Sequence, residues 1–159
     1  MGSQPSEEKA YIAGFLDGDG SIMLQIKKRS DTSRGTRFMV TICFYQDTRH
    51  EKDLHWIRSI LGVGYLSKRN DGMSELRING YESVKNIVHQ LLPYIKFKRL
   101  QARALYTAMN ILSSKKYNAL SRKQLDTLVN LVLAIQNENY VTKKKKTKGE
   151  LLKMLDLTP

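Results

Sequence analysis

The stretch Tyr11-Ile12-Ala13-Gly14-Phe15-Leu16-Asp17-Gly18-Asp19-Gly20-Ser21 joins a small, apolar segment to two acids that alternate with glycines. Its apolar residues recur at helical spacing. Ala10, Gly14 and Gly18 fall four residues apart, so they share one face of the expected helix and leave it almost without side chains. Such a face allows another backbone to approach closely. The two carboxylates then stand at the negative end of the helix dipole, which favours a cation among them.

The acids and glycines of this stretch have other interpretations. Asp17 to Gly20 is also typical of a helix end followed by a turn, with Gly18 or Gly20 at positive φ. A calcium loop of the EF-hand type is excluded, because Ile22 occupies the position that needs glycine and Lys28 the position that needs glutamate. The residues of the stretch alone leave the first alternative open.

The charge of the chain indicates a polyanionic partner. The 159 residues suggest one domain with a sizeable core, and their formal net charge is +12. Six lysines and one glutamate lie between Lys143 and Lys153, so more than half of the excess charge lies elsewhere. A basic body favours nucleic acid as the partner, with a ribosome-like structural role or simple solubility as the competing explanations.

The cysteine content and the hydropathy exclude several classes. Cys43 is the single cysteine, so the chain has no disulfide framework and no cysteine-based zinc site. No apolar run approaches the ~20 residues that cross a bilayer, and no targeting segment is visible. We therefore expect no membrane partner.

The hydrophobic pattern of the first half predicts alternating helices and strand pairs. A helix runs from Ser6 to about Asp17, and strands over 22–29 and 37–45 follow, each with one apolar and one solvated face. Cys43 falls on the solvated face of the second strand. A helix then ends at Gly62, strands over 65–69 and 75–79 flank a tight turn at 70–72, and Pro93 stops the next helix.

Further helical stripes cover 102–112 and 121–135, and Ser121 with Gln124 forms a capping box for the second. The fold class is therefore α+β, with the order αββαββα and extra C-terminal helices. We divide the chain into a disordered N-terminus or cloning remnant (1–5), one domain (6–142) and a basic C-terminal segment (143–159) in which Thr147 and Glu150 can cap a short helix.

The opening stretch resembles the LAGLIDADG motif of homing endonucleases, with residues 12–20 at the nine motif positions. The αββαββα order is that family's fold, with a saddle-shaped antiparallel sheet that binds DNA. The segments 62–65, 92–98 and 101–102 are similar to their counterparts in small single-motif members encoded in organellar group I introns. The resemblance covers nearly all of residues 10–140.

The resemblance implies a site-specific double-strand DNA endonuclease for intron homing, which hydrolyses phosphodiesters and leaves 3′ overhangs. Because the chain holds one motif, it implies a homodimer on a pseudo-palindromic site of about 20 base pairs. The dimer interface would contain Ala10, Gly14, Phe15 and Gly18. The expected location is a chloroplast or mitochondrion that encodes the protein. The alternatives are an RNA maturase and a non-catalytic DNA-binding protein of the same fold.

The resemblance also implies a catalytic site. Asp19 and the carbonyl of Gly18 would ligate Mg²⁺, with Mn²⁺ expected to substitute and Ca²⁺ to bind without supporting cleavage. Gln46 would order water, and Lys98 would stabilise charge or assist proton movement. His50 stands where close relatives carry arginine, so it either donates to the phosphate or is a surface residue at a helix start. Asp17 is expected to bond the helix end rather than metal, and no small-molecule cofactor is expected.

DNA reading is expected from the solvated strand faces, which would lie in the major groove. The exposed lysines that follow the domain are expected to contact phosphates. The expected DNA-binding residues are Met23, Gln25, Lys27, Arg29, Arg37, Met39, Thr41, Tyr45, Ser67, Arg69, Glu75, Arg77, Lys143, Lys144 and Lys145.

Overall fold

The computed structural model describes residues 5–140 and 142–157 and confirms the predicted order of elements. Residues 1–4, 141 and 158–159 lie outside the described residues, and Pro5 already belongs to the first helix. Three short 3₁₀ turns, at Thr48–His50, Leu92–Tyr94 and Tyr117–Ala119, connect the longer elements. These are α1 (Pro5–Asp19), β1 (Gly20–Lys28), β2 (Thr36–Asp47), α2 (Glu51–Leu61), β3 (Tyr65–Lys68), β4 (Met73–Asn79), α3 (Tyr81–Leu91), α4 (Arg99–Ser114), α5 (Arg122–Glu138) and α6 (Lys148–Met154).

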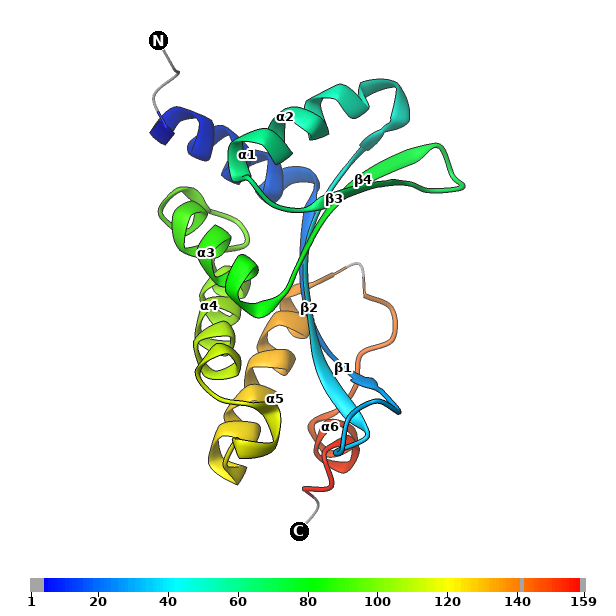
Figure 1. Cartoon of the computed structure of the whole chain (residues 1–159), viewed down its shortest axis with the longest axis vertical. Coiled ribbons are helices and arrows are strands. Elements are labelled where there is room, and N and C mark those ends of the chain that lie inside the picture. The colour runs from blue at the N-terminus through cyan, green and yellow to red at the C-terminus, as the bar shows by residue number, and fades with distance from the viewer. Residues whose placement is uncertain (1–4, 141, 158–159) are drawn as a thin grey trace.

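The four strands form one antiparallel sheet in the order β1-β2-β4-β3, so the two hairpins meet through their second strands. Residues Gly20 to Lys28 pair with Phe44 to Thr36, and Thr41 to Asp47 pair with Asn79 to Met73. The strands are long and curved, and α3, α4 and α5 lie on the same side of the sheet, with α1 and α2 above them (Figure 1).

The predicted alternation places one face of the sheet in the core. Side chains at even positions of β1 and β2, from Ile22 to Ile26 and from Phe38 to Phe44, are buried against the helices. Burying such side chains removes apolar surface from water, worth about 1.5–3 kcal/mol for each large one. The opposite face of the sheet carries the polar side chains and is free of the helical layer.

The end of α1 differs from the prediction. The helix continues through Asp19 instead of ending near Asp17, and the chain enters β1 directly at Gly20. Neither Gly18 nor Gly20 has a positive φ, so the alternative of a helix stop and a glycine turn is wrong. Positive φ values occur instead at Gly62, which ends α2, and at Gly35 and Gly72 in the two hairpin loops.

The C-terminal segment belongs to the same body as the rest of the fold. Thr147 caps α6 by accepting a hydrogen bond from the N–H of Glu150, as predicted. Leu151 and Leu155 are buried in the common core, where α6 contacts β1 and α5. Among the described residues, no helix is long and apolar enough to traverse a bilayer.

Asp17 fastens the end of α1 to the start of α4. Its side chain is 9% exposed, and its carboxylate accepts hydrogen bonds from the backbone N–H groups of Lys96 (2.7 Å), Phe97 (3.3 Å) and Lys98 (3.0 Å). Asp17 is expected from the sequence to bond the end of its own helix, α1. The donors instead come from the segment before α4. The acid thus satisfies donors that a helix start leaves without partners.

We predict that Asp17→Asn lowers the free energy of unfolding by about 1.5–3 kcal/mol, because hydrogen bonds to a charged acceptor are of that size. Urea denaturation followed by circular dichroism measures the change. The control is Asp156→Asn, an exposed residue after α6 with a φ of 55°, a conformation that asparagine tolerates. Equal stability of the two variants would contradict the structural role of Asp17.

Candidate nucleic-acid interface and cleavage site

Asp17 and Asp19 have different environments although they are separated by one residue. Asp17 is occupied by backbone donors, whereas Asp19 is exposed as the last residue of α1. Asp19 lies at the negative end of the helix dipole, with the carbonyl of Gly18 beside it in the chain. Hard oxygen donors at such an end suit a divalent cation. The structure therefore separates one structural acid from one acid that is available for a ligand.

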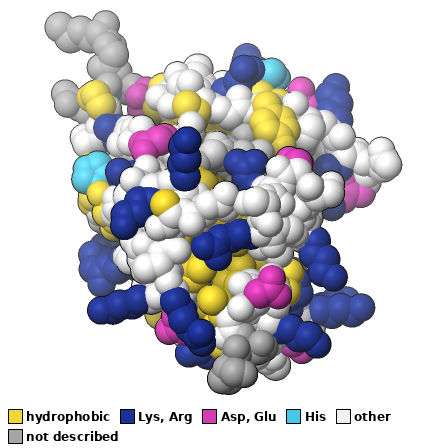
Figure 2. All heavy atoms as spheres, turned by 60° about the horizontal axis from the view of Figure 1, so that its bottom comes forward, with side chains coloured by type: hydrophobic (Ala, Val, Ile, Leu, Met, Phe, Trp, Pro, Cys, Tyr) yellow, Lys and Arg dark blue, Asp and Glu magenta, His cyan; other side chains and the backbone are white. Residues whose placement is uncertain are grey.

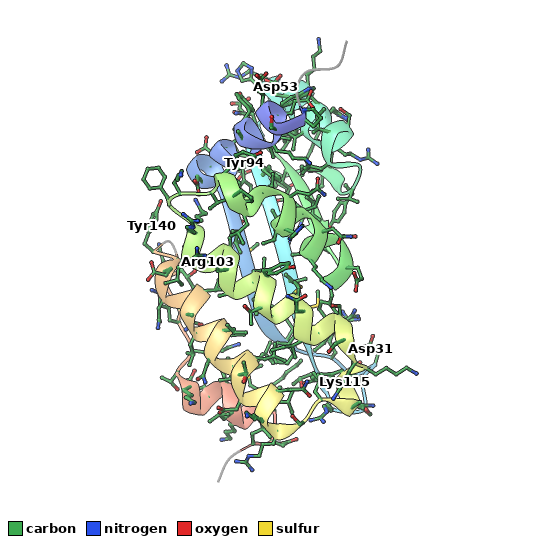
Figure 3. The ribbon with its side chains drawn as sticks, turned by 90° about the vertical axis from the view of Figure 1, so that its left-hand side faces the viewer. Asp31, Asp53, Tyr94, Arg103, Lys115 and Tyr140 are labelled. Atoms are coloured by element: carbon green, nitrogen blue, oxygen red, sulfur yellow. The ribbon has the colours of Figure 1, made fainter. Side chains whose placement is uncertain are left out.

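Asp19 lies in a cavity that also contains Lys98. Other walls come from the motif (Asp17, Gly18) and from β2 (Tyr45). The remaining walls include Phe97 before α4, Gln101 in α4, Glu138 at the end of α5 and Tyr140 after it. Phe97 is 87% exposed and Tyr140 is 89% exposed, so these rings border the cavity without being covered. Tyr140 projects outward at the end of α5 (Figure 3).

Lys98 is held by the backbone of α1. Its ammonium donates a hydrogen bond to the carbonyl of Asp17. Burial lowers the pKa of Lys98 below its usual range, and the carboxylates of Asp17 and Asp19 oppose that shift. The result is a positioned cation beside Asp19, where negative charge on a phosphate can be stabilised.

The other two expected catalytic residues lie outside this cavity in the single chain. Gln46 is on the helix-facing side of β2 and lines a separate groove with Tyr11, Phe15 and Trp56. Its side-chain oxygen accepts a hydrogen bond from the N–H of Asp47 (2.9 Å). His50 is exposed at the end of the 3₁₀ turn before α2. The structure thus brings Asp19, Gly18 and Lys98 together, but not Gln46 or His50.

The expected DNA-reading side chains of the strands share one face. Cross-strand neighbours include Gln25 with Met39, Lys27 with Arg37, and Glu75 with both Tyr45 and Ser67. Arg29 and Arg69 follow β1 and β3 directly and are exposed. All twelve sheet residues therefore lie on or beside the face opposite the helices.

The middle of this face is less accessible than the alternation suggests. Thr41 is 7% exposed and Glu75 is 8% exposed, and the thiol of Cys43 is fully covered. Because β2 and β4 each have neighbouring strands on both sides, their central positions are enclosed by side chains of the adjacent strands. The expectation that Cys43 is solvated is therefore wrong, and Thr41 instead donates a hydrogen bond to Asn79 (2.9 Å).

Several residues of this surface were not expected as site residues. Ser21, Tyr65 and Asn79 lie on the same sheet face, and Ser21 is hydrogen-bonded to Tyr45 (3.0 Å). These three residues follow the same alternation as their neighbours in β1, β3 and β4, so the sequence pattern could have identified them. Gln101 and Tyr140 line the Asp19 cavity through tertiary packing, for which the local sequence carries no signal.

The basic run after α5 is held as a loop along β1. The side-chain amide of Gln136 makes two hydrogen bonds to the backbone of Lys146. Its Nε2 donates to the Lys146 carbonyl (2.7 Å), and its Oε1 accepts from the Lys146 N–H (3.1 Å). Asn139 donates to the carbonyl of Ile22 in β1 (3.1 Å). Lys143 to Lys145 are exposed between these two attachments. Figure 2 shows Lys and Arg side chains spread over this end of the molecule, with few acids among them.

The small-residue face of α1 is open. A Cβ added at Gly14 or Gly18 would meet no atom within 4 Å, and Ala10 is exposed. Phe15 is partly buried and stacks on Phe44 at a ring distance of 6.1 Å. Tyr11 and Trp56, both exposed, pack edge to face beside it. A helix face of this composition is large enough and bare enough for a second backbone.

Comparison with known proteins agrees with this geometry. Residues 12–107 match the family model described as LAGLIDADG endonuclease. The chain is 38% identical to DNA endonuclease I-CvuI of Chlorella vulgaris over 107 residues, which span 67% of this chain and 66% of that protein. It is 29% identical to DNA endonuclease I-CreI of Chlamydomonas reinhardtii over 143 residues, 90% of this chain and 85% of that protein.

Solved structures show the same fold. I-CvuI in complex with its target and calcium superimposes with a TM-score of 0.76 at 31% identity, covering 98% of both chains. An archaeal intron-encoded homing endonuclease, I-Vdi141I, complexed with DNA, has a TM-score of 0.81 at 20% identity, covering 96% of this chain and 97% of that one. With its motif helix, its sheet and its matched residues, this chain belongs to the LAGLIDADG endonuclease family.

Proposed function

We propose that this protein is a homodimeric, divalent-metal-dependent endonuclease that cuts double-stranded DNA at a specific site and serves intron homing. The observation that carries the proposal is the junction of α1 and β1, where exposed Asp19 and positioned Lys98 meet the polar sheet face. Relatives support it, because I-CvuI and I-CreI are DNA endonucleases and I-CvuI binds DNA targets in its solved structures.

The oxygen ligands present in one chain fit half of a Mg²⁺ site. Asp19 and the Gly18 carbonyl offer oxygen ligands, while Asp17 is already occupied by N–H donors. Among residues 5–140 and 142–157, no group of three or more His, Cys, Asp and Glu side chains could enclose a metal. Mg²⁺ retains waters and takes ligands from substrate phosphates, so a site completed by DNA and a second copy suits it. Mn²⁺ as a substitute and Ca²⁺ as a non-catalytic occupant are part of the proposal.

The protein's own residues would bind the metal, orient the phosphodiester and neutralise its negative charge. The bound metal would stabilise the oxygens of the phosphodiester that gain charge during hydrolysis. Lys98 offers its ammonium to the same phosphate from within the cavity. We assign Gln46 to the ordering of water and His50 to a contact with the phosphate or its waters. Gln46 lines the groove beside Tyr11 and Phe15 of α1, and His50 is exposed at the end of the turn before α2.

The basic sheet face and the held lysine loop would contact DNA together. The β1–β2 hairpin runs nine paired residues, a length of about 30 Å at ~3.3 Å per residue. That length matches about nine base pairs per subunit, so a dimer covers a site of about 20 base pairs. Because the relatives come from two algae, we propose that the protein acts in the chloroplast or mitochondrion that encodes it.

We predict that Asp19→Asn leaves DNA binding within about threefold of the unaltered protein but reduces cleavage at least about 1,000-fold, because it removes the exposed carboxylate at the end of the motif helix. The target is first obtained by cleavage selection from a library of long sites. Binding is then measured with Ca²⁺ and cleavage with Mg²⁺. Asp126→Asn, at a half-exposed position in α5 that pairs with Lys148, is the control. Cleavage by the Asp19 variant at the unaltered rate would refute the proposal.

We predict that Gly14→Leu converts the dimer to a monomer, since the added side chain occupies the open face where α1 of the second copy would pack. Sedimentation velocity across a range of concentrations measures the change. The matched control is Gly149→Leu in the first turn of α6, away from α1. A Gly14 variant that sediments as the unaltered dimer would show that α1 does not form the interface.

We predict that Lys143→Ala and Lys144→Ala each reduce the slope of log affinity against log salt concentration by about 1, as expected for one lost phosphate contact. Fluorescence anisotropy with a labelled target at several salt concentrations measures the slope. Lys123→Ala, an exposed lysine at the start of α5, should leave the slope unchanged. Unchanged slopes in all three variants would remove the loop from the DNA interface.

A further inference from the structure

A buried acid lies at the centre of the polar sheet face. Glu75 of β4 accepts hydrogen bonds from Arg77 Nη1 (3.0 Å) and Ser67 Oγ (3.3 Å) on one oxygen, and from Cys43 Sγ (3.9 Å) on the other. The donors come from three adjacent strands, β2, β3 and β4. Both oxygens of the carboxylate are therefore engaged by the protein itself.

These contacts make Glu75 unsuited to reading a base. A carboxylate that recognises DNA must accept a hydrogen bond from an exposed base edge, typically the amino group of cytosine. Glu75 is 8% exposed, and its oxygens already have donors. Burial raises the pKa of the Cys43 thiol to about 11, so the thiol remains protonated and can donate.

Arg77 is the partner that reaches the surface. Its side chain is 34% exposed, three times the 11% of Glu75 in the same ion pair. Its Nε is buried and has no hydrogen-bond partner among the described residues, and Nη1 is held by Glu75. The donors left for a ligand are those of Nη2 and the second hydrogen of Nη1. Of these three N–H groups, two that lie side by side at the end of the planar group match the paired acceptors O6 and N7 of guanine.

We propose that Glu75 is a positioning residue that orients Arg77 to read one guanine in each half-site, with Ser67 and Cys43 as supporting donors. The inference deepens the proposed function and rests on it. It changes the assignment of Glu75 from a base reader to the residue that fixes the reader. An arginine held in one orientation selects guanine, whereas a mobile arginine contacts phosphates and several bases.

The test compares base preferences in four proteins: the unaltered chain, Glu75→Gln, Arg77→Ala and the double variant. A library of sites is selected twice, once for retention with Ca²⁺ and once for cleavage with Mg²⁺. We expect the unaltered protein to prefer guanine about 5- to 100-fold at one symmetric pair of positions. Arg77→Ala should abolish this preference, and Glu75→Gln should reduce it at least fivefold at the same pair and nowhere else. The double variant should equal Arg77→Ala.

The Lys148–Asp126 pair provides a control away from the sheet face. It joins α6 to α5 at 3.8 Å, and both side chains are about half exposed. Asp126→Asn should leave the profile unchanged. If Glu75→Gln does not fold, Cys43→Ala and Ser67→Ala each remove one donor and should weaken the same preference by a smaller factor.

Three outcomes would overturn the inference: an unchanged profile for Glu75→Gln, equal loss of preference at all positions, or a guanine preference that survives Arg77→Ala. Failure of the proposed function is distinguishable from these. If sites are retained but never cut, endonuclease activity is refuted, while the retained sites still test the Glu75–Arg77 pair.

Discussion

The bond between Asp17 and the backbone of residues 96–98 is the constraint on which the rest of the site depends. It joins α1 to the start of α4 across about half of the chain. Because α1 ends two residues later, the same bond sets where Asp19 emerges. The return contact, from Lys98 to the Asp17 carbonyl, places the ammonium beside that acid. One buried carboxylate thus positions both charged groups of the candidate cleavage site.

This arrangement also explains how two neighbouring acids differ in role. A carboxylate surrounded by three N–H groups loses little on leaving water, because those donors replace its hydration. Among the described residues, Asp19 has no such donors, and it stays at the surface, where the carbonyls at the end of α1 make the local potential negative. A cation reduces that unfavourable charge. A cation bound at Asp19 would therefore stabilise the end of α1.

The order of the helices and strands was predictable from the sequence, and so was the polar face of the sheet. Period-two alternation selects a face, and glycine or proline marks the ends, as at Gly62 and Pro93. Alternation does not show how much of a central strand its neighbours cover, so Cys43 was wrongly expected to be solvated. Nor could the end of α1 be predicted, since its geometry depends on donors about 80 residues away. The resemblance, rather than any local pattern, indicated that Asp19 and Lys98 belong to one site. The ordered lysine loop also depends on a tertiary contact, made by Gln136.

The covered thiol at Cys43 gives the molecule a practical property. A sulfhydryl reacts through its ionised form, and one that is fully buried with a pKa of about 11 is almost entirely protonated at neutral pH. Since it is the single cysteine of the chain, the surface has no competing nucleophile of this kind. A cysteine introduced on the lysine loop or beside Tyr140 would therefore take up a fluorophore or spin label alone. The native sequence is thus already suited to labelling at one introduced cysteine, without removal of any natural residue.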